Sequence, residues 1–319
     1  SFAVESAARS LQPILTADTV IANAGKGLQE DSLLRFSQVI SREVPQCSVV
    51  VLSGPSHAEE VARGVPTTVV SASQDMAAAE AVQQWLMNPR FRIYVNPDVI
   101  GVELGGALKN VIALAAGIVD GMQLGDNTKA ALMTRGLAEM ARLGVALGAK
   151  SATFAGLSGM GDLVVTCGSM HSRNRRAGIL IGQGFTAEQA VKQVGTVEGI
   201  NALPAAMQLM ERYQVEMPIA KAVNAVVKGE ISAKDMALAL MTRDKTSEVR
   251  QSELAVRFES ALMRHISGGI MRRVMVIGEF ADLSHEAIAF LTRAKDEGGH
   301  LTVALTGCSQ DVRKSSLLA

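Results

Sequence analysis

The stretch GVELGGALKNVIALAAGIVDGM, residues 101–122, decides how this chain of 319 residues is organised. It is apolar on nearly every side and rich in small residues, as is typical of a helix buried among closely packed neighbours. Before it, short β-branched runs alternate with helical patterns, and after it this strand signal disappears. The stretch therefore predicts a boundary near residue 100 between an α/β part and an all-helical part.

Residues 1–100 alternate between two hydrophobic periods. Short apolar runs that end in turn residues are typical of buried strands, and they are DTVIANAG, CSVVVLSGP, PTTVVSAS and FRIYVNP. Segments with helical spacing and polar faces lie between these runs. The alternation predicts an α/β fold with a largely parallel sheet and helices on its faces.

The remainder divides into two parts. Residues 101–248 have helical patterns throughout, with Ser232 and Asp235 as a capping pair and Pro218 in a first turn. In residues 249–319 a polar helix precedes a strand (MRRVMVIGEF), a helix (SHEAIAFLTRAKDEGG) and a second strand (HLTVALTG). This order predicts a short βαβ-like tail, too small to bury a core of its own.

The overall composition argues against several classes of function. Lysine plus arginine number 31, as do aspartate plus glutamate, so no overall field attracts nucleic acid or an anionic membrane. No uninterrupted apolar segment approaches the ~18 residues that span a bilayer. The three cysteines, Cys47, Cys167 and Cys308, are widely spaced, which argues against a disulfide framework or a zinc site. We expect a soluble cytoplasmic protein without a metal site.

The segment GILIGQGFTAEQAV, residues 178–191, has the glycine spacing of a dinucleotide-binding fingerprint. A fingerprint needs a preceding strand in a parallel sheet, but a polar segment and only four apolar residues come before these glycines. Thr186 and Gln189 form a capping box. The sequence favours a turn between two helices.

Several polar side chains are candidates for chemistry. Lys109 lies among apolar residues, where it either extends its ammonium group to solvent or is buried, with a lowered pKa suited to acid–base catalysis. Asn110 beside it can orient a substrate oxygen. Lys26 and Ser56 follow predicted strands, at the sheet edge where ligands bind in open α/β folds. The alternative for both residues is an ordinary strand-to-helix turn. We expect His57 to be a first-turn helix residue rather than a catalytic base.

Two further segments have functional and structural interpretations. In GLSGMGDLVVTC a glycine turn presents Asp162 either as an acid in a cleft or as a helix cap. HSRNRR contains three arginines beside a serine and an asparagine, and these side chains suit a phosphate or carboxylate, whereas a solvated basic turn is the alternative. The candidate residues are Ser172, Arg173, Asn174, Arg175 and Arg176.

The ordered set of motifs carries more information than any member. The chain contains GKGL, SGPSHAEEVARG, GGALKNVIALAAGI, TRGLAEMARLG, GLSGMGDLVVTC, SRNRR and VEMPI, in this order. Over residues 1 to about 248 it closely resembles the bacterial NAD(P)-dependent glycerol-3-phosphate dehydrogenases. The resemblance implies that residues 1–100 are the C-terminal half of a Rossmann dinucleotide-binding domain and residues 101–248 an all-helical catalytic and substrate domain.

The resemblance also implies an activity and a site. A cytoplasmic homodimer would transfer hydride between NAD(P)H and dihydroxyacetone phosphate, giving sn-glycerol 3-phosphate for phospholipid synthesis. Lys109 matches the proton donor and acceptor. The matching substrate-binding positions are Lys26, Gly54, Ser56, Asn110, Asp162, Ser172, Arg173 and Asn174. The positions that match contacts to NAD or NADP are Lys26, Ala58, Arg173 and Glu198.

Both ends of the chain depart from the family pattern. Family members begin with a strand and a GxGxxG turn that do not precede Ser1, so we expect the N-terminal half of the dinucleotide-binding domain to be missing. GEFADLSHEAIAFLTRAK resembles the opening of a cytidylyltransferase, although Ile288 stands where a second histidine would follow His285. We expect residues 249–319 to be an unrelated extension. The alternative function is a non-catalytic remnant, a helical dimerising or phosphate-ligand-binding module.

Overall fold

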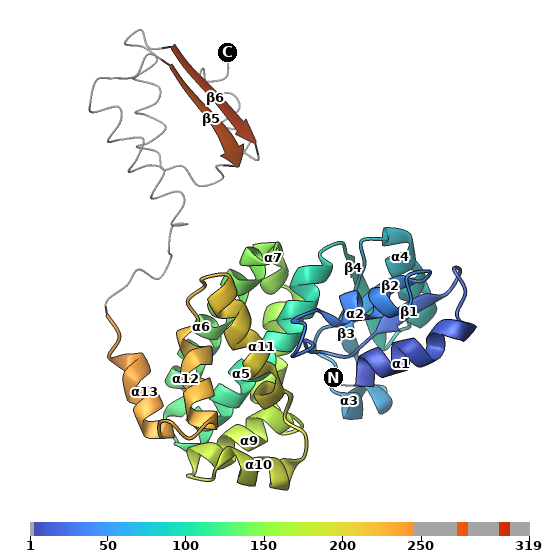
Figure 1. The fold of residues 1–319 in the computed structure, drawn as a ribbon. Helices are drawn as coiled ribbons and strands as arrows, with labels where there is room; N and C mark the ends of the chain where they lie inside the picture. The colour runs from blue at the N-terminus through green and yellow to red at the C-terminus, as the bar shows by residue number, and fades with distance from the viewer. Residues whose placement is uncertain (1–2, 245–272, 280–299, 307–319) are drawn as a thin grey trace. The chain divides into compact units, whose positions relative to one another are not determined.

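The computed structural model describes residues 3–244, 273–279 and 300–306. Contacts between residues divide the chain into two compact units, residues 1–243 and residues 244–319, and each is described separately. The first unit contains a sheet with its own helices and a larger helical bundle (Figure 1).

The sheet of the first unit has four strands in the order of the sequence: β1 (Val20–Asn23), β2 (Ser48–Ser53), β3 (Thr67–Ala72) and β4 (Phe91–Asn96). Its helices are α1 (Ala3–Leu11), the 3-10 turn η1 (Gln12–Ile14), α2 (Phe36–Glu43), α3 (Ala58–Ala62) and α4 (Met76–Leu86). Val49 packs with the core of α1 and α2, whereas Val50 packs with α4. Successive strand residues point to opposite faces, so α2 and α4 cover opposite faces of the sheet.

The α/β fold class is confirmed, but the sheet differs from the prediction in the direction of one strand pair. The β1–β2 and β3–β4 pairs are parallel, as expected, but β2 and β3 are antiparallel, with Val51 opposite Ala72. The connection contains only the five-residue helix α3, which spans roughly 7.5 Å. A six-residue strand extends about 20 Å, so this helix alone does not return the chain to the other end of the sheet, and β3 runs back from the edge at which β2 ends. The sheet is therefore mixed.

The helical part is built around α5 (Val99–Gly121), which follows β4 directly and is buried on nearly every side. By length and composition α5 could cross a membrane, but 94% of its most apolar window is buried inside the protein, so it is a core helix. Around it or beside its neighbours lie α6 (Gly125–Ala146), α7 (Ser151–Phe154), the π-turn η2 (Leu157–Gly161), α8 (Asp162–Gly168), α9 (Arg173–Gly182), α10 (Ala187–Val194), α11 (Glu198–Arg212), α12 (Pro218–Val227) and α13 (Ala233–Met241).

Glycines allow α5 and α9 to touch through their backbones. A Cβ atom on Gly178 of α9 would lie 2.8 Å from the Cα atom of Gly117 on α5, and Gly182 and Gly121 repeat this close approach one turn further along. No larger residue fits at these positions. The small residues of the 101–122 stretch therefore fix the distance between the two helices.

The predicted helix boundaries in this part are confirmed. Ser232 and Asp235 form the capping box of α13, and Pro218 is in the first turn of α12. Thr186 and Gln189 form the capping box of α10. Gly184, with a φ of 101°, lies in the turn between α9 and α10. The fingerprint-like glycines therefore end α9 at Gly182 and form the turn to α10 at Gly184, as the sequence favoured.

A buried carboxylate joins α6 to α12. Glu139 is 1% exposed, and its oxygens accept hydrogen bonds from the backbone N–H groups of Ile219 (2.8 Å) and Ala220 (3.2 Å) at the first turn of α12. Burial raises the pKa of Glu139 to about 7. The folded protein therefore binds a proton at this site more tightly than the unfolded chain does.

Replacing Glu139 with glutamine should remove one pH-dependent contribution to stability. A raised folded pKa stabilises the protein below the unfolded pKa, and this contribution is lost as the pH rises from about 4.5 to about 7. Its size is on the order of 3 kcal/mol. Urea unfolding at pH 5 and pH 8 should show a smaller decline for Glu139→Gln than for the wild type. Equal declines in the two proteins would contradict the raised pKa of Glu139.

In the second unit, β5 (Arg273–Glu279) and β6 (His300–Thr306) are parallel neighbours, with Arg273 opposite His300 and Glu279 opposite Thr306. The sequence predicted both strands. The two predicted helices of residues 249–319, and His285 in the cytidylyltransferase-like segment, lie outside the described residues.

Candidate active site

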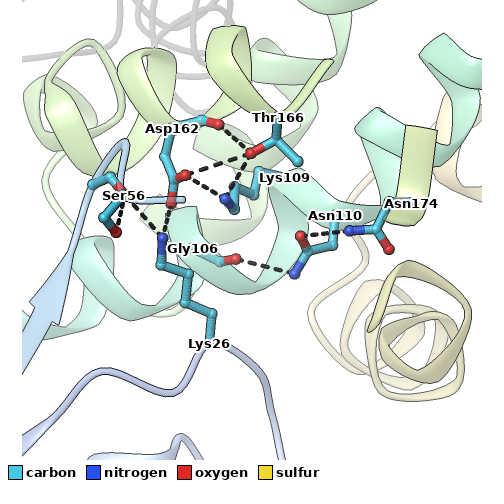
Figure 2. A network of polar contacts seen from close by, with 9 residues as sticks. Lys26, Ser56, Gly106, Lys109, Asn110, Asp162, Thr166 and Asn174 are labelled. Atoms are coloured by element: carbon cyan, nitrogen blue, oxygen red, sulfur yellow. Dashed lines mark hydrogen bonds and ion pairs between the residues drawn. The ribbon is translucent and has the colours of Figure 1, made fainter. Parts of the chain in front are cut away.

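Helix α5 carries Lys109 and Asn110 into the site. The helix begins at the end of β4, where Asp98 caps it by accepting a hydrogen bond from the Gly101 N–H (2.9 Å). Lys109 is 5% exposed, so its ammonium group does not extend to solvent. Because the helix starts at a strand end, its middle brings this lysine toward the turns that follow β1 and β2 (Figure 2).

Asp162 joins two lysines from distant parts of the chain. Its Oδ2 accepts a hydrogen bond from Lys26 Nζ at 2.6 Å, and its Oδ1 is in contact with Lys109 Nζ. Lys109 Nζ also donates to Thr166 Oγ1 (2.7 Å), and Thr166 in turn lies 2.6 Å from the backbone oxygen of Asp162. Two cations on one carboxylate leave a net positive charge, which suits an anionic ligand or an oxygen that gains negative charge.

The surroundings of Lys109 lower its pKa to about 8. Burial is the largest cause, and the positive charge of Lys26 acts in the same direction. The negative charge of Asp162 opposes both. An ammonium group with such a pKa can give up a proton and regain it near neutral pH, as acid–base catalysis requires.

The turn after β2 supplies oxygens to the same cluster. The backbone oxygen of Gly54 accepts hydrogen bonds from Lys26 Nζ (2.9 Å) and from the Ser56 hydroxyl (3.0 Å). Gly54 has a φ of 130°, a conformation that strongly favours glycine. The strand-to-helix turns that carry Lys26 and Ser56 therefore meet at the backbone oxygen of Gly54.

A chain of amides runs from α5 across α9 to α11. Asn174 donates its side-chain N–H to Asn110 Oδ1 (3.0 Å) and accepts the backbone N–H of Gly199 (2.7 Å). Asn110 also approaches the backbone oxygen of Gly106 at 3.4 Å. These bonds fix the orientation of the Asn110 amide next to Lys109.

The SRNRR segment begins α9. Ser172 caps the helix by accepting the backbone N–H of Arg175 at 3.2 Å. The Arg175 guanidinium is held by Asp120 (2.7 Å) and therefore has a structural role. Arg173 is exposed, and its guanidinium lies 3.9 Å from the position that a Cβ atom of Gly195 would take. Of the three arginines in this segment, Arg173 is the exposed one.

Comparisons with known proteins show the family to which this chain belongs. The family model for the NAD-dependent glycerol-3-phosphate dehydrogenase N-terminus matches residues 1–79, and the model for the C-terminus of the same family matches residues 98–238. A glycerol-3-phosphate dehydrogenase (NAD(P)+) of Clostridium perfringens is 55% identical over 249 residues, which are 78% of this chain and 75% of the relative.

The chain belongs to the NAD(P)-dependent glycerol-3-phosphate dehydrogenase family.

Other relatives support the assignment. A glycerol-3-phosphate dehydrogenase (NAD(P)+) of Moorella thermoacetica is 55% identical over 254 residues, 79% of this chain and 76% of the relative. The crystal structure of a glycerol-3-phosphate dehydrogenase from Coxiella burnetii superposes with a TM-score of 0.72 at 39% identity, covering 76% of this chain and 74% of that one. This chain is thus a glycerol-3-phosphate dehydrogenase by family, an oxidoreductase with NAD(P) as coenzyme.

The structure brings together most of the predicted site residues of this dehydrogenase. One hydrogen-bonded network contains Lys26, Gly54, Ser56, Lys109 and Asp162, and a second contains Asn110 and Asn174 (Figure 2). Ser172 caps α9 beside Asn174. Ala58, Arg173 and Glu198 lie outside both networks, at the first residues of α3, α9 and α11 respectively.

Sequence reasoning missed one site residue, Thr166, and placed His57 one position too far into its helix. Thr166, which contacts Lys109, lies one helical turn after Asp162 in α8, and this i, i+4 spacing in GDLVVT was the available signal. His57 is the cap residue of α3 rather than a first-turn residue. Burial is the main reason that its pKa is lowered, and the nearby charge of Lys109 acts in the same direction.

The residues of the site fit a bound nicotinamide coenzyme and substrate. Ser53 Oγ and His57 Nε2 are buried and have no hydrogen-bond partner among the described residues. Ser53 Oγ lies 2.9 Å from the position of a Cβ atom on Gly106, beside the Lys26 side chain. Buried polar atoms without partners are costly, so these two are available for a ligand at the same edge of the sheet.

Proposed function

We propose that Lys26, Lys109 and Asp162 form the centre at which dihydroxyacetone phosphate is reduced to sn-glycerol 3-phosphate, with Lys109 as the proton donor. The observation that carries this proposal is the buried Lys109 ammonium group, held by Asp162 and Thr166, with a pKa of about 8. In the reverse direction the neutral amine accepts the proton of the substrate hydroxyl.

The mechanism depends on charge at the reacting oxygen. When bound, NAD(P)H supplies the hydride that the carbonyl carbon of the substrate receives. The carbonyl oxygen then gains negative charge, which the Lys26 and Lys109 ammonium groups stabilise. Lys109 Nζ gives its proton to this oxygen, while Asp162 and Thr166 hold the nitrogen in place. Asn110, fixed by Asn174, orients a second substrate oxygen.

The N-terminus of α9 supports the recognition of the phosphate. Its first-turn N–H groups favour an anion, and Arg173 offers a planar guanidinium group next to them. In this proposal Ser172, Arg173 and Asn174 face the phosphate end of the substrate, and Gly54 and Ser56 contact its other oxygens. Ala58, Glu198, Lys26 and Arg173 contact the coenzyme.

The proposed roles of the two parts of the chain follow from the fold. In this proposal residues 1–100 belong to the dinucleotide-binding domain and residues 101–248 form the catalytic and substrate domain. The family resemblance further supports a cytoplasmic homodimer whose product enters phospholipid synthesis.

A turnover assay tests the proposed function. The purified chain should oxidise NADH or NADPH in the presence of dihydroxyacetone phosphate and should use unphosphorylated dihydroxyacetone poorly. Arg173→Ala should raise KM for the phosphorylated substrate about 10- to 100-fold, because a hydrogen bond to a charged group contributes about 1.5–3 kcal/mol. KM for dihydroxyacetone should change little.

Lys192→Ala is the matched control, since Lys192 is a surface residue that forms an ion pair with Glu188 of its own helix. It should leave both KM values unchanged. An unchanged discrimination between the two substrates in Arg173→Ala would remove Arg173 from the phosphate site.

A further inference from the structure

Glu103 is a buried carboxylate on α5 for which the mechanism above has no use. It is 5% exposed. Its Oε2 accepts hydrogen bonds from Arg35 Nη1 and the Ser37 hydroxyl, each at 2.5 Å, and its Oε1 accepts the backbone N–H of Ser37 at 2.8 Å. Arg35 is the cap residue of α2. Glu103 therefore attaches the start of α2 to α5.

The segment that ends at Arg35 also carries Lys26. Leu28 and Arg35 pair as an antiparallel bridge, and Gln29 donates its backbone N–H to the Leu34 oxygen at 2.9 Å. The Leu28 side chain is buried in the core around α5. The backbone at Lys26, two residues before Leu28, is thus linked through this bridge to the position of Arg35.

Helix α5 also touches Lys26 directly. A Cβ atom on Gly106, one turn after Glu103, would lie 3.3 Å from Lys26 Cγ, so the aliphatic part of Lys26 rests on the helix at that glycine. The same helix carries Lys109, about 9 Å beyond Glu103 along its axis. One rigid element therefore holds the segment of Lys26 at two points and presents its reaction partner.

We propose that Glu103 is a positioning residue for the reaction. Through Arg35 and Ser37 it holds the segment of residues 24–35 so that the Lys26 ammonium group stays between the oxygens of Gly54 and Asp162. A buried ion pair gives little stability compared with apolar residues of the same size, whereas directed bonds of this kind fix one geometry. The inference rests on the proposed role of Lys26.

A double-mutant cycle tests the proposal. Glu103→Gln keeps the shape and removes the charge, and it should lower kcat/KM for dihydroxyacetone phosphate about 10- to 100-fold, because small misplacements of this kind cost about this much. In a Lys26→Ala background the same substitution should change kcat/KM less than about twofold, since residues that act through one another are not additive.

Two variants keep the test independent of folding. Ser37→Ala removes one of the bonds to Glu103 and should show the same non-additivity with a smaller effect, even if Glu103→Gln does not fold. Glu139→Gln, at the other buried glutamate described above, is the matched control and should leave kcat/KM unchanged.

The pH profile provides a readout that loss of stability alone would not move. Lys109 is surrounded by Asp162 and Thr166 on α8, by Lys26 on its segment and by His57 before α3. If Lys26 moves away, the pKa of Lys109 should rise, and the decline of the reduction rate at alkaline pH should shift to higher pH. Lys26→Ala should show this shift too, and Glu139→Gln should not.

The outcomes distinguish the positioning role of Glu103 from the proposed role of Lys26. Additive effects of Glu103→Gln and Lys26→Ala, with Lys26→Ala impaired, would overturn the positioning role alone. Unchanged kinetics in both the Glu103→Gln and Ser37→Ala variants would overturn it as well. Full activity of Lys26→Ala would overturn the proposed role of Lys26, and this inference with it.

Discussion

Replacing Lys109 with methionine should lower kcat for the reduction of dihydroxyacetone phosphate by about 100- to 10,000-fold, the range that a positioned general acid contributes. The substitution removes the proton that the carbonyl oxygen receives and one of the two cations near it. Stopped-flow and steady-state measurements of NADH oxidation give the change directly.

The same variant should not lose stability. Burial lowers the pKa of Lys109, which means that the folded protein holds this charge at a cost. Methionine removes the cost and fills a similar volume, while Asp162 keeps its bond to Lys26. The melting temperature should therefore stay the same or rise, and coenzyme binding measured by fluorescence should be retained.

Lys129→Met is the matched control for Lys109→Met. Lys129 is also a largely buried lysine of the helical part in an ion pair, with Asp120 at 2.8 Å, but it lies outside the cluster of Lys109. It should keep wild-type kcat. If Lys109→Met kept more than about a tenth of the wild-type kcat, Lys109 could not be the general acid.

Asp162→Asn should have the second large effect, on activity and on stability together. Asp162 is 1% exposed and is the carboxylate between the two lysine ammonium groups. Without its charge, the buried Lys109 and the partly buried Lys26 face each other as two cations. Breaking a buried pair in this way costs about 3–5 kcal/mol. We expect kcat/KM to fall by at least about 100-fold, because the lysines are no longer held.

The pH dependence of this effect has a definite sign. Lys109 has a lowered folded pKa, and the loss of Asp162 lowers it further, since that carboxylate raises the pKa. Above this pKa the amine is neutral and no longer repels Lys26. Urea unfolding should therefore show a larger stability loss for Asp162→Asn at pH 6 than at pH 9.

Asp120→Asn is the control for removing a carboxylate that joins two cations. Asp120 also joins two cations, Lys129 and Arg175, but its side chain is 21% exposed, so solvent screens them. Its stability loss should be smaller and should depend less on pH. Equal losses in the two variants would show that burial of the Asp162 cluster has no special cost.

Local patterns were sufficient for much of the fold and for the chemistry. The small and apolar residues of α5 predicted a buried helix, and the one lysine among them had to be either extended to solvent or functional. Lys26 and Ser56 became candidates because they follow predicted strands, and Asp162 because it follows a glycine turn. The structure places the three residues in one network. Such features depend on neighbours in the chain, which a sequence displays.

Features that depend on distant residues could not be predicted in the same way. The Arg35–Glu103 pair joins residues that are 68 positions apart, and nothing in either local segment indicates the partner. The antiparallel step from β2 to β3 depends on how far the short helix α3 can carry the chain, which composition does not show. The contribution of Thr166 to the site could have been predicted, because Thr166 lies only four residues after Asp162.

The glycine contacts between α5 and α9 bear on how the site closes around a substrate. With their backbones in contact at Gly117 and Gly178, the two helices cannot slide or tilt against each other without a clash. Lys109, Asn110 and Asn174 are thereby parts of one rigid wall. Any closure over the substrate would then move other elements against a wall that keeps its shape.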